Sequence, residues 1–401
     1  MSACSSSTDS SVTPMEGYLG ESSILRPYFN LKDSLPYVNA KSIQIKLEEY
    51  QITKLALEKI YTYLGTSFGN GDMASGRRLF IKLVKSEEIW VERIGLDKQR
   101  ARDKFYIICD KVLGEGTNNT LHLGFSRKGT ARAITEKKVS VNDFNSMRLI
   151  QEFNEAIKDD PLRFAISRLK GSEEGLQVSE LGGENLLELK INKLSQKERF
   201  QIHKSSIAGL ACIHSHGFVH RDLKSNNEVV VRNEEGKVIG AKIIDFDTLE
   251  KINKRAFAEV TYQDYRSLDI LKICMNHHNP VQRRITTHPG DDLWAAMITI
   301  CKLEKKVDKD KRFISGGFMK RFSEYQKACK PDNDQDEQLR YAGQYLFLMS
   351  LKSNLFEDIK SKSILDPLIR EMAFKDVRKA DSMKAEELLE WMSSIEEGIS
   401  G

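Results

Sequence analysis

The stretch FVHRDLKSNNEVVV, residues Phe218 to Val231, decides how the rest of the chain is interpreted. It places a His, an Arg, an Asp, a Lys and an Asn within the eight residues 220–227, between apolar residues on both sides. A surface loop does not need such a cluster. A second acidic segment, KIIDFD at residues 242–247, comes shortly after it and contributes Asp245. Together the two segments indicate a site that binds a charged ligand and moves a proton.

The residue types in these segments suit the transfer of a phosphoryl group. That reaction asks for positioning and charge neutralisation more than for covalent chemistry. Magnesium prefers oxygen ligands, which Asn227 and Asp245 offer. Asp222 is the candidate carboxylate to orient an attacking hydroxyl and take its proton. Lys224, two residues further on, is the candidate cation for the charge of the transferred group.

A strand, a turn and two further strands are predicted upstream. Residues 105–113 are rich in β-branched and aromatic side chains and run into the turn GEGTNN at 114–119. Small residues there would let backbone amides approach an anion. Strands are predicted again at 121–126 and 131–139, and the last of them carries Lys137, in a position to reach phosphates. A helix over 143–158 carries Glu152, a candidate partner for Lys137.

Composition limits the class of protein. The 401-residue chain has 30% charged residues and a net charge of +4, with its basic residues scattered, so nucleic acid is not a predicted partner. Its six cysteines are far apart and form no CxxC pair, which suits a reducing compartment. No apolar run is long enough to cross a bilayer. We therefore predict a cytoplasmic protein without a membrane span, in a host cytoplasm if the source is an intracellular pathogen.

The order of the expected elements predicts an α+β fold. Residues 1–40 are predicted to form a largely disordered Ser/Thr-rich tail, and residues 41–102 an accessory region expected to bind a partner or brace the main domain. That domain is predicted at 103–395, with a small β-rich lobe at 103–180 and a larger helical lobe at 185–395. Within it, short strands are expected at 164–166 and 176–178, and a long helix at 195–216.

The motifs resemble those of eukaryotic-type protein kinases. HRDLKSNN is similar to that family's catalytic loop, HRDLKxxN, and is specific by itself. Residues 113–116 (LGEG) resemble the glycine-rich loop, and residues 134–137 the strand with the ATP lysine. Glu152 fits the helix glutamate that pairs with this lysine, and Ser179-Glu180 the hinge that receives adenine. Asp245-Phe-Asp247 resembles the magnesium-binding triplet. The resemblance covers about residues 103 to 395.

The resemblance implies a bilobal protein-kinase-like fold, ATP and Mg²⁺ as cofactors, and a protein substrate. Lys224 resembles the lysine of the serine/threonine kinases, so a Ser/Thr hydroxyl is the expected acceptor. The implied catalytic residues are Asp222, Lys224 and Asn227, and the implied metal ligands are Asn227 and Asp245. The implied nucleotide-binding residues are Leu113, Gly114, Glu115, Gly116, Thr117, Leu121, Lys137, Glu152 and Glu180.

Two further segments fit the family, and three positions depart from it. Residues 265–269 (YRSLD) stand where the family has Y-x-A-P-E, with Asp269 as the acid and Arg378 as its expected partner; residues 292–295 (DLWA) resemble the start of its long buried helix. Asn119 replaces the third glycine of the glycine-rich loop. Asp247 replaces the glycine that ends the family's magnesium-binding triplet, and the proline of the Y-x-A-P-E segment is missing. Arg221 is expected to bind a regulatory phosphate if one is present, with Thr261 as the candidate acceptor, although constitutive activity fits as well.

Two other functions remain open at this stage. Ile244-Asp-Phe-Asp247 also resembles the second motif of small-molecule phosphotransferases of the aminoglycoside and choline kinase type. Those enzymes usually have another residue, often Gly, at the position between the His and the Asp where this chain has Arg221. They also lack the helix that begins with D-x-W. A pseudokinase scaffold is the second alternative, and the intact Lys137, Asp222, Asn227 and Asp245 argue against it.

Overall fold

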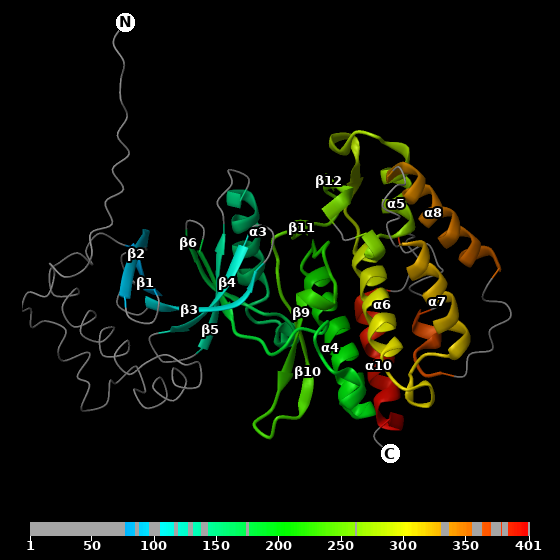
Figure 1. Cartoon of the computed structure of the whole chain (residues 1–401), viewed down its shortest axis with the longest axis horizontal. Coiled ribbons are helices and arrows are strands. Elements are labelled where there is room, and N and C mark those ends of the chain that lie inside the picture. Colours follow the sequence, from blue (N-terminus) through cyan, green and yellow to red (C-terminus); the bar gives the residue numbers. More distant parts are fainter. Residues whose placement is uncertain are drawn as a thin grey trace, which may run out of the picture. The chain divides into compact units, whose positions relative to one another are not determined.

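Strands β1 to β7 form one seven-stranded sheet (Figure 1). The computed structural model describes residues 77–84, 88–95, 105–115, 119–126, 131–137, 143–173, 176–260, 263–329, 337–354, 363–369, 378 and 384–399. The predicted tail at 1–40 and most of the accessory region lie outside these residues. Two compact units are present: Met1–Ser140 with Leu169–Leu181, and Val141–Arg168 with Gly182–Gly401. Residues 141–168, assigned to the small lobe from sequence, group with the second unit.

The first unit is the sheet. Its strands are β1 (Arg77–Val84), β2 (Glu88–Gly95), β3 (Phe105–Glu115), β4 (Asn119–Ser126), β5 (Ala131–Lys137), β6 (Leu169–Glu173) and β7 (Leu176–Glu180). Their spatial order is β2-β1-β3-β4-β5-β7-β6, and every neighbouring pair is antiparallel except β1 and β3. Ile108, Ile134, Leu176 and Val178 pack into one buried cluster. The strands predicted at 105–113, 121–126, 131–139 and 176–178 are thereby confirmed within a few residues.

The second unit is mainly helical. Its long elements are α3 (Asp143–Ala156), α4 (Gln196–Ser215), α5 (Leu268–Asn276), α6 (Pro289–Lys305), α7 (Gly316–Ala328), α8 (Glu337–Asn354) and α10 (Ala385–Ile399). Its short strands are β8 (Phe218–Val219), β9 (Glu228–Arg232), β10 (Val238–Ile243), β11 (Glu250–Lys251), β12 (Arg255–Phe257) and β13 (Arg284–Thr286). These strands pair antiparallel as β9–β10, β8–β11 and β12–β13.

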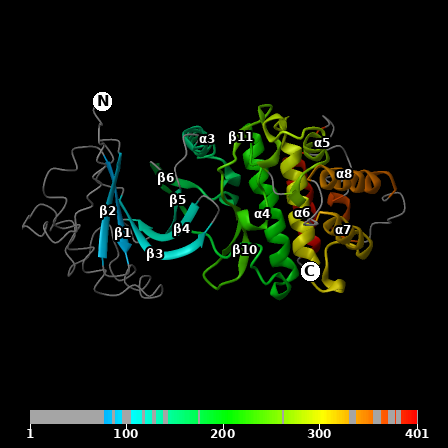
Figure 2. The same ribbon diagram turned by 45° about the horizontal axis from the view of Figure 1, so that its top comes forward.

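Helix α4 is the centre of the second unit, with α6 and α10 packed along it (Figure 2). Ser195 caps it: the Ser195 hydroxyl accepts from the backbone N–H of Glu198, and the Glu198 carboxylate accepts from the N–H of Ser195. This reciprocal capping satisfies two backbone donors at the start of the helix. The apolar face predicted from the sequence is buried. Gly217 ends the helix with a φ of 79°, in the left-handed region that glycine tolerates.

A buried ionic network joins α4 to α6. The Glu304 carboxylate lies 3.3 Å from Nε of Arg199 and 3.1 Å from Nε2 of His203, and it accepts from the N–H of Phe313. Burial acts to raise the pKa of Glu304, but these hydrogen bonds and the nearby charge of Arg199 hold it below its ordinary value. A buried carboxylate with partners on both oxygens is tolerated, whereas removal of one partner would leave an uncompensated charge.

One predicted strand is wrong. Residues 164–166 were expected to be extended, but Pro161–Ala165 forms a short 3₁₀ helix, η5. Asp160 caps it, with its Oδ1 accepting from the N–H of Leu162 at 2.6 Å, and Pro161 supplies the fixed φ of a first helical position. Only Ile166, after the helix, makes a single bridge to Ile243. The local cap and proline outweigh the apolar pattern.

Strand β9 carries a buried acid where a core residue is expected. Glu228 has no exposed surface, and burial raises its pKa to about 7 despite the opposing hydrogen bond with the Ser206 hydroxyl. That hydroxyl also lies 3.1 Å from the Ile202 carbonyl oxygen. A protonated Glu228 can donate to Ser206 while Ser206 donates to Ile202, so the neutral acid fits the site best.

This acid makes folding stability depend on pH. Between the ordinary pKa of 4.5 and about 7, the unfolded chain loses the Glu228 proton while the folded chain keeps it. The free energy of unfolding should therefore fall by about 3 kcal/mol as pH rises through that window. Glu228→Gln should lack this component, so its stability relative to wild type should improve from pH 5 to pH 8. Denaturant unfolding at several pH values measures the difference, with the exposed Glu235→Gln as control; parallel pH profiles for wild type and Glu228→Gln would contradict the assignment.

Candidate active site

The loop 220–227 is anchored by a buried carboxylate in the first turn of α6. Asp292 accepts from the backbone N–H of His220 at 2.8 Å and of Arg221 at 2.7 Å, and lies 3.0 Å from Nε2 of His214. Burial acts to raise the pKa of Asp292, but the bonds from His214 and Arg221 and the nearby His220 lower it below its ordinary value. Arg221 has a φ of 72°, which costs a non-glycine residue about 1–2 kcal/mol. The two hydrogen bonds offset this cost.

Three of the predicted residues form one hydrogen-bonded cluster. Oδ2 of Asp222 accepts from Nζ of Lys224 at 2.7 Å and from Nδ2 of Asn227 at 3.0 Å. Nδ2 of Asn227 also donates to the Asp222 carbonyl at 2.8 Å. Because both amide protons of Asn227 point to Asp222, the amide is oriented and its Oδ1 is the atom left to bind a cation. Oxygen atoms of this kind are the ligands that magnesium prefers.

Asp245 lies beside Asn227 because of strand pairing. In the β9–β10 ladder Ile243 is opposite Glu228, and the N–H of Ile244 donates to the Asn227 carbonyl at 2.8 Å. Asn227 thus ends the loop before β9, and Asp245 follows β10 at the same end of the ladder. Asp245 is exposed and has a φ of 63°. An amide oxygen and a carboxylate at one strand end fit a magnesium ion.

His220 connects the loop 220–227 to the segment 244–247, which carries the predicted magnesium ligand Asp245. Its Nε2 lies 3.0 Å from the Ile244 carbonyl oxygen, and its ring packs edge-on against Phe246, with centroids 5.2 Å apart. Phe246 also packs on Phe153 of α3, which in turn contacts Phe218. These aromatic contacts connect α3, the loop and the metal segment within the second unit. The apolar periodicity of α3 includes Phe153, but no pattern in the sequence pairs it with Phe246.

Glu152 has a partner that the sequence reasoning missed. It is exposed on α3 and forms an ion pair with Nζ of Lys251, on β11. The same ammonium lies 4.1 Å from the ring centroid of Phe218. Lys137 ends β5 in the other unit, so its predicted pairing with Glu152 stays a prediction. No spacing rule identifies Lys251, since it lies in the two-residue strand β11, which no pattern in the sequence predicts.

Arg221 holds the segment that comes after the metal triplet. Its guanidinium donates to the carbonyl oxygens of Thr248 and Phe257, and the Thr248 hydroxyl donates to the His220 carbonyl at 2.7 Å. Phe257 ends β12, which pairs with β13 just before α6. Backbone carbonyls are therefore partners of the Arg221 guanidinium, and its expected role as a phosphate ligand stays a prediction. Thr261, the candidate phosphate acceptor, lies outside the described residues.

The predicted ion pair of Arg378 is confirmed and extended. Its guanidinium lies 3.4 Å from Oδ2 of Asp269, and it also pairs with Asp291 in the first turn of α6. Burial raises the pKa of Asp291, although Arg378 and the Ser267 hydroxyl oppose the shift. The sequence gives no separate signal for Asp291, because it stands directly before the DLWA motif and looks like an ordinary first-turn acid. Asp291 thus binds Arg378, whereas its neighbour Asp292 binds the loop 220–227.

The predicted nucleotide residues that the structure describes lie on the sheet of the first unit, apart from Glu152. β3 and β4 form a hairpin with Glu115 opposite Thr120, and Leu113, Gly114 and Glu115 are exposed at the end of β3. Gly116 and Thr117 fall in the connection at 116–118, outside the described residues. The remaining positions follow the ladder: Leu121 is opposite Thr135, Lys137 is opposite Asn119, and Glu180 is opposite Arg132.

The chain was compared with protein families and with curated proteins. A search of curated proteins found no match to the chain. No helix in the described part of the chain is long and apolar enough to cross a membrane. The family model of the protein kinase domain matches residues 110–393, well over half of the 401 residues, and spans both the glycine hairpin and the loop anchored by Asp292. The chain belongs to the protein kinase family.

Proposed function

We propose that this protein kinase transfers the γ-phosphate of ATP, with Mg²⁺, to serine and threonine hydroxyls of cytoplasmic proteins. The observation that carries the proposal is the cluster of Asp222, Lys224 and Asn227 beside Asp245. We assign ATP to the glycine hairpin, Leu121, Lys137 and Glu180, and we assign Mg²⁺ to Asn227 and Asp245. The metal would neutralise phosphate charge when bound.

The proton and phosphoryl transfers can be assigned within this cluster. The acceptor hydroxyl oxygen forms a bond to the γ-phosphorus as the bond to the oxygen bridging the β- and γ-phosphates breaks, and ADP leaves. The hydroxyl proton passes to Asp222, whose carboxylate is held by Lys224 and Asn227. The ammonium of Lys224 is close enough to Asp222 to serve the transferred group as well. A lysine at this position supports a Ser/Thr rather than a Tyr acceptor.

Removal of the proposed base should abolish transfer. Asp222→Asn keeps the size of the side chain but removes the proton acceptor, so phosphorylation should fall by at least about 100-fold. Purified protein with labelled ATP, Mg²⁺ and two generic proteins, one basic and one acidic, measures it, and a thermal melt checks the fold. Label found only in aminoglycosides or choline would instead indicate a small-molecule phosphotransferase. Nucleotide binding without any turnover in the wild type would indicate a pseudokinase.

Lys251 should lower the activity of the enzyme, because it pairs with the Glu152 carboxylate, which we assign as the partner of Lys137. Lys251→Met removes the ion pair with Glu152, and we expect kcat/KM for ATP to rise several-fold. Glu152→Gln removes the partner of both lysines and should lower it. Lys204→Met breaks a surface ion pair of the same type, with Glu396, and serves as the control. Equal activity of wild type and Lys251→Met would show that the pair does not restrain Glu152.

The β12–β13 ribbon points to the charge of the protein substrate. Arg255 and Phe257 of β12 and Arg284 of β13 are exposed, and the Arg284 guanidinium lies 4.1 Å from the Phe257 ring centroid. Arg221 ties this ribbon to the loop that carries Asp222, through the Phe257 carbonyl. A peptide presenting its hydroxyl to Asp222 would therefore run close to exposed guanidinium groups. We propose a preference for acidic residues beside the acceptor.

Charge reversal tests this preference. Arg255→Glu and Arg284→Glu should each raise KM for an acidic acceptor peptide several-fold, since an exposed charge pair contributes up to about 1 kcal/mol. KM for a matched basic peptide should fall, and both effects should shrink in high salt. The exposed Lys237→Glu, on the β9–β10 turn, is the control. Identical ratios of the two KM values in all variants would exclude the ribbon as a determinant of specificity.

A further inference from the structure

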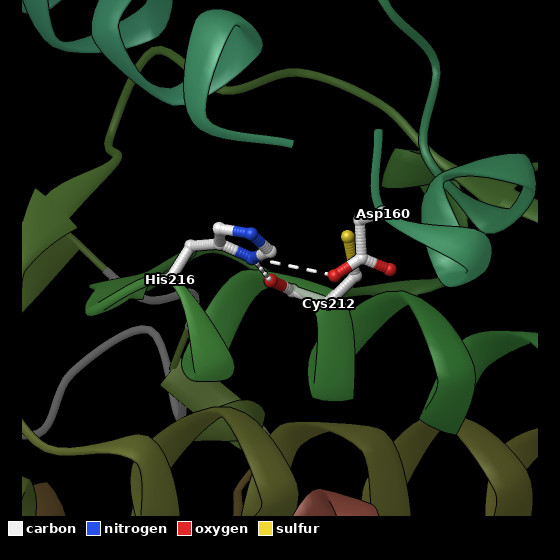
Figure 3. Close-up of side chains that lie close together, drawn as sticks. All are labelled: Asp160, Cys212 and His216. Carbon is white, nitrogen blue, oxygen red and sulfur yellow. Dashed lines mark hydrogen bonds and ion pairs between the residues drawn. The ribbon is translucent and has the colours of Figure 1, made fainter. Parts of the chain in front are cut away.

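Three potential metal ligands meet at the end of α4 (Figure 3), and none of them is one of the proposed magnesium ligands. Cys212 and His216 are four residues apart on and just after the helix, which places them on one face. Asp160, the cap of η5, faces them from the segment after α3. Sγ of Cys212, Nδ1 of His216 and a carboxylate oxygen of Asp160 all lie within 4.8 Å of one another.

The Asp160 carboxylate is held in position by its surroundings. Its Oδ1 accepts from the N–H of Leu162 at 2.6 Å, so that Oδ2 is the oxygen 3.6 Å from Nδ1 of His216. The backbone of Asp160 is fixed as well: its N–H donates to the Ile157 carbonyl, and its carbonyl accepts from Arg163. Partners of this kind orient a ligand before a metal arrives and raise the affinity of the site.

Exposure gives a metal ion a route to these ligands. The Cys212 side chain is fully buried, whereas the side chains of His216 and Asp160 keep 24% and 13% of their surface exposed. An ion between the three groups would have sulfur on its buried side and water on the other. Bonds of 2.0–2.3 Å in a tetrahedral site bring ligand atoms to about 3.5 Å from one another. Contraction by about 1 Å from the present positions is within the reach of side-chain rotation.

The cluster also has an interpretation without metal, as a hydrogen-bonded end of the helix. The Cys212 thiol is hydrogen bonded to Asp160, and Nδ1 of His216 lies 2.9 Å from the Cys212 carbonyl oxygen. Burial first, and then Asp160, raise the pKa of the Cys212 thiol to about 12. A thiol of this kind is no nucleophile near neutral pH, so the trio of Cys, His and Asp is not a hydrolase triad. A metal ion, by contrast, displaces a thiol proton directly.

We propose that Asp160, Cys212 and His216 bind one Zn²⁺ ion, with water as the fourth ligand. Sulfur, imidazole nitrogen and carboxylate oxygen are the three protein ligand types of zinc, and the thiolate disfavours Mg²⁺ and Ca²⁺. Binding forms the zinc–sulfur bond and releases the thiol proton to solvent. In the metal-free site the imidazole proton is on Nδ1, where it is donated to the Cys212 carbonyl oxygen. On metal binding this proton leaves Nδ1 and solvent supplies one to Nε2, so that the Nδ1 lone pair binds the metal and the Cys212 carbonyl loses its donor.

The site would connect two parts of the kinase machinery. Asp160 lies four residues after α3, the helix of Glu152, and His216 lies four residues before His220 of the catalytic loop. Both belong to the second unit. A bound ion would therefore fix the segment after α3 to the beginning of the catalytic loop. The proposal does not depend on the acceptor of the phosphoryl group.

Metal binding by the full-length protein tests the proposal without an activity assay. After removal of metals, the protein should take up one Zn²⁺ in competition with a chelating dye, and a tenfold excess of Mg²⁺ should not displace it. Co²⁺ in its place should give a sulfur-to-cobalt charge-transfer absorption, and Zn²⁺ should raise Tm. His216→Gln and Asp160→Asn should each weaken Zn²⁺ binding by at least about 100-fold, because loss of an outer partner alone costs 10- to 100-fold.

The controls separate this site from other metal ligands. His278→Gln, an exposed histidine outside the cluster, should bind Zn²⁺ as the wild type does. Cys212→Ser should remove the cobalt charge-transfer absorption; if that variant does not fold, the His216→Gln result and the wild-type spectrum decide. Absence of stoichiometric Zn²⁺ binding, a cobalt complex without a thiolate signature, or unchanged affinity in His216→Gln would each overturn the proposal.

Discussion

The hydrogen bonds to the buried carboxylate of Asp292 are the constraint on which the site depends. A loop with a left-handed arginine does not hold its shape by backbone preference, and its N–H groups point into the protein instead of toward a strand. Asp292 takes two of these groups and His214 together. Most residues of the long helix α6 are buried, so the packing of the core sets the position of the loop.

That anchor has an effect on each side of the loop. On one side, the loop continues into β9, and the β9–β10 ladder carries Asp245 to the same end as Asn227. On the other, the Arg221 side chain reaches out to two carbonyls and holds the ribbon of β12 and β13. The backbone of one residue is therefore fixed from inside the core, while its side chain organises a segment outside it. Charge-assisted hydrogen bonds of this kind are among the stronger ones in proteins.

The sequence predicted the fold class, most strands of the sheet, α3, α4, the start of α6 and the Arg378–Asp269 pair. The strands and helices were predicted from period-two and period-3.6 apolar patterns, whereas the start of α6 and the Arg378–Asp269 pair were predicted from the resemblance to the kinase motifs. Contacts between side chains distant in sequence were not predictable where no kinase motif pairs the two positions. The ion pairs of Glu152 with Lys251 and of Arg378 with Asp291 depend on the folded positions of segments that the sequence patterns do not specify. The strand expected at 164–166 was wrong, because the Asp160 cap and Pro161 start a 3₁₀ helix there.

The parallel pairing of β1 with β3 gives the region before residue 103 a physical role. Leu79 to Lys82 bond to Phe105 to Ile108, so β3, which leads into the glycine hairpin, has a neighbour on each side. A chain shortened to start at residue 103 would keep every proposed catalytic group, yet it would expose the donors and acceptors of β3 along one border. Unpaired borders of this kind attract other strands. In the described part of the chain, β1 therefore covers a border of β3 that would otherwise be open to other strands.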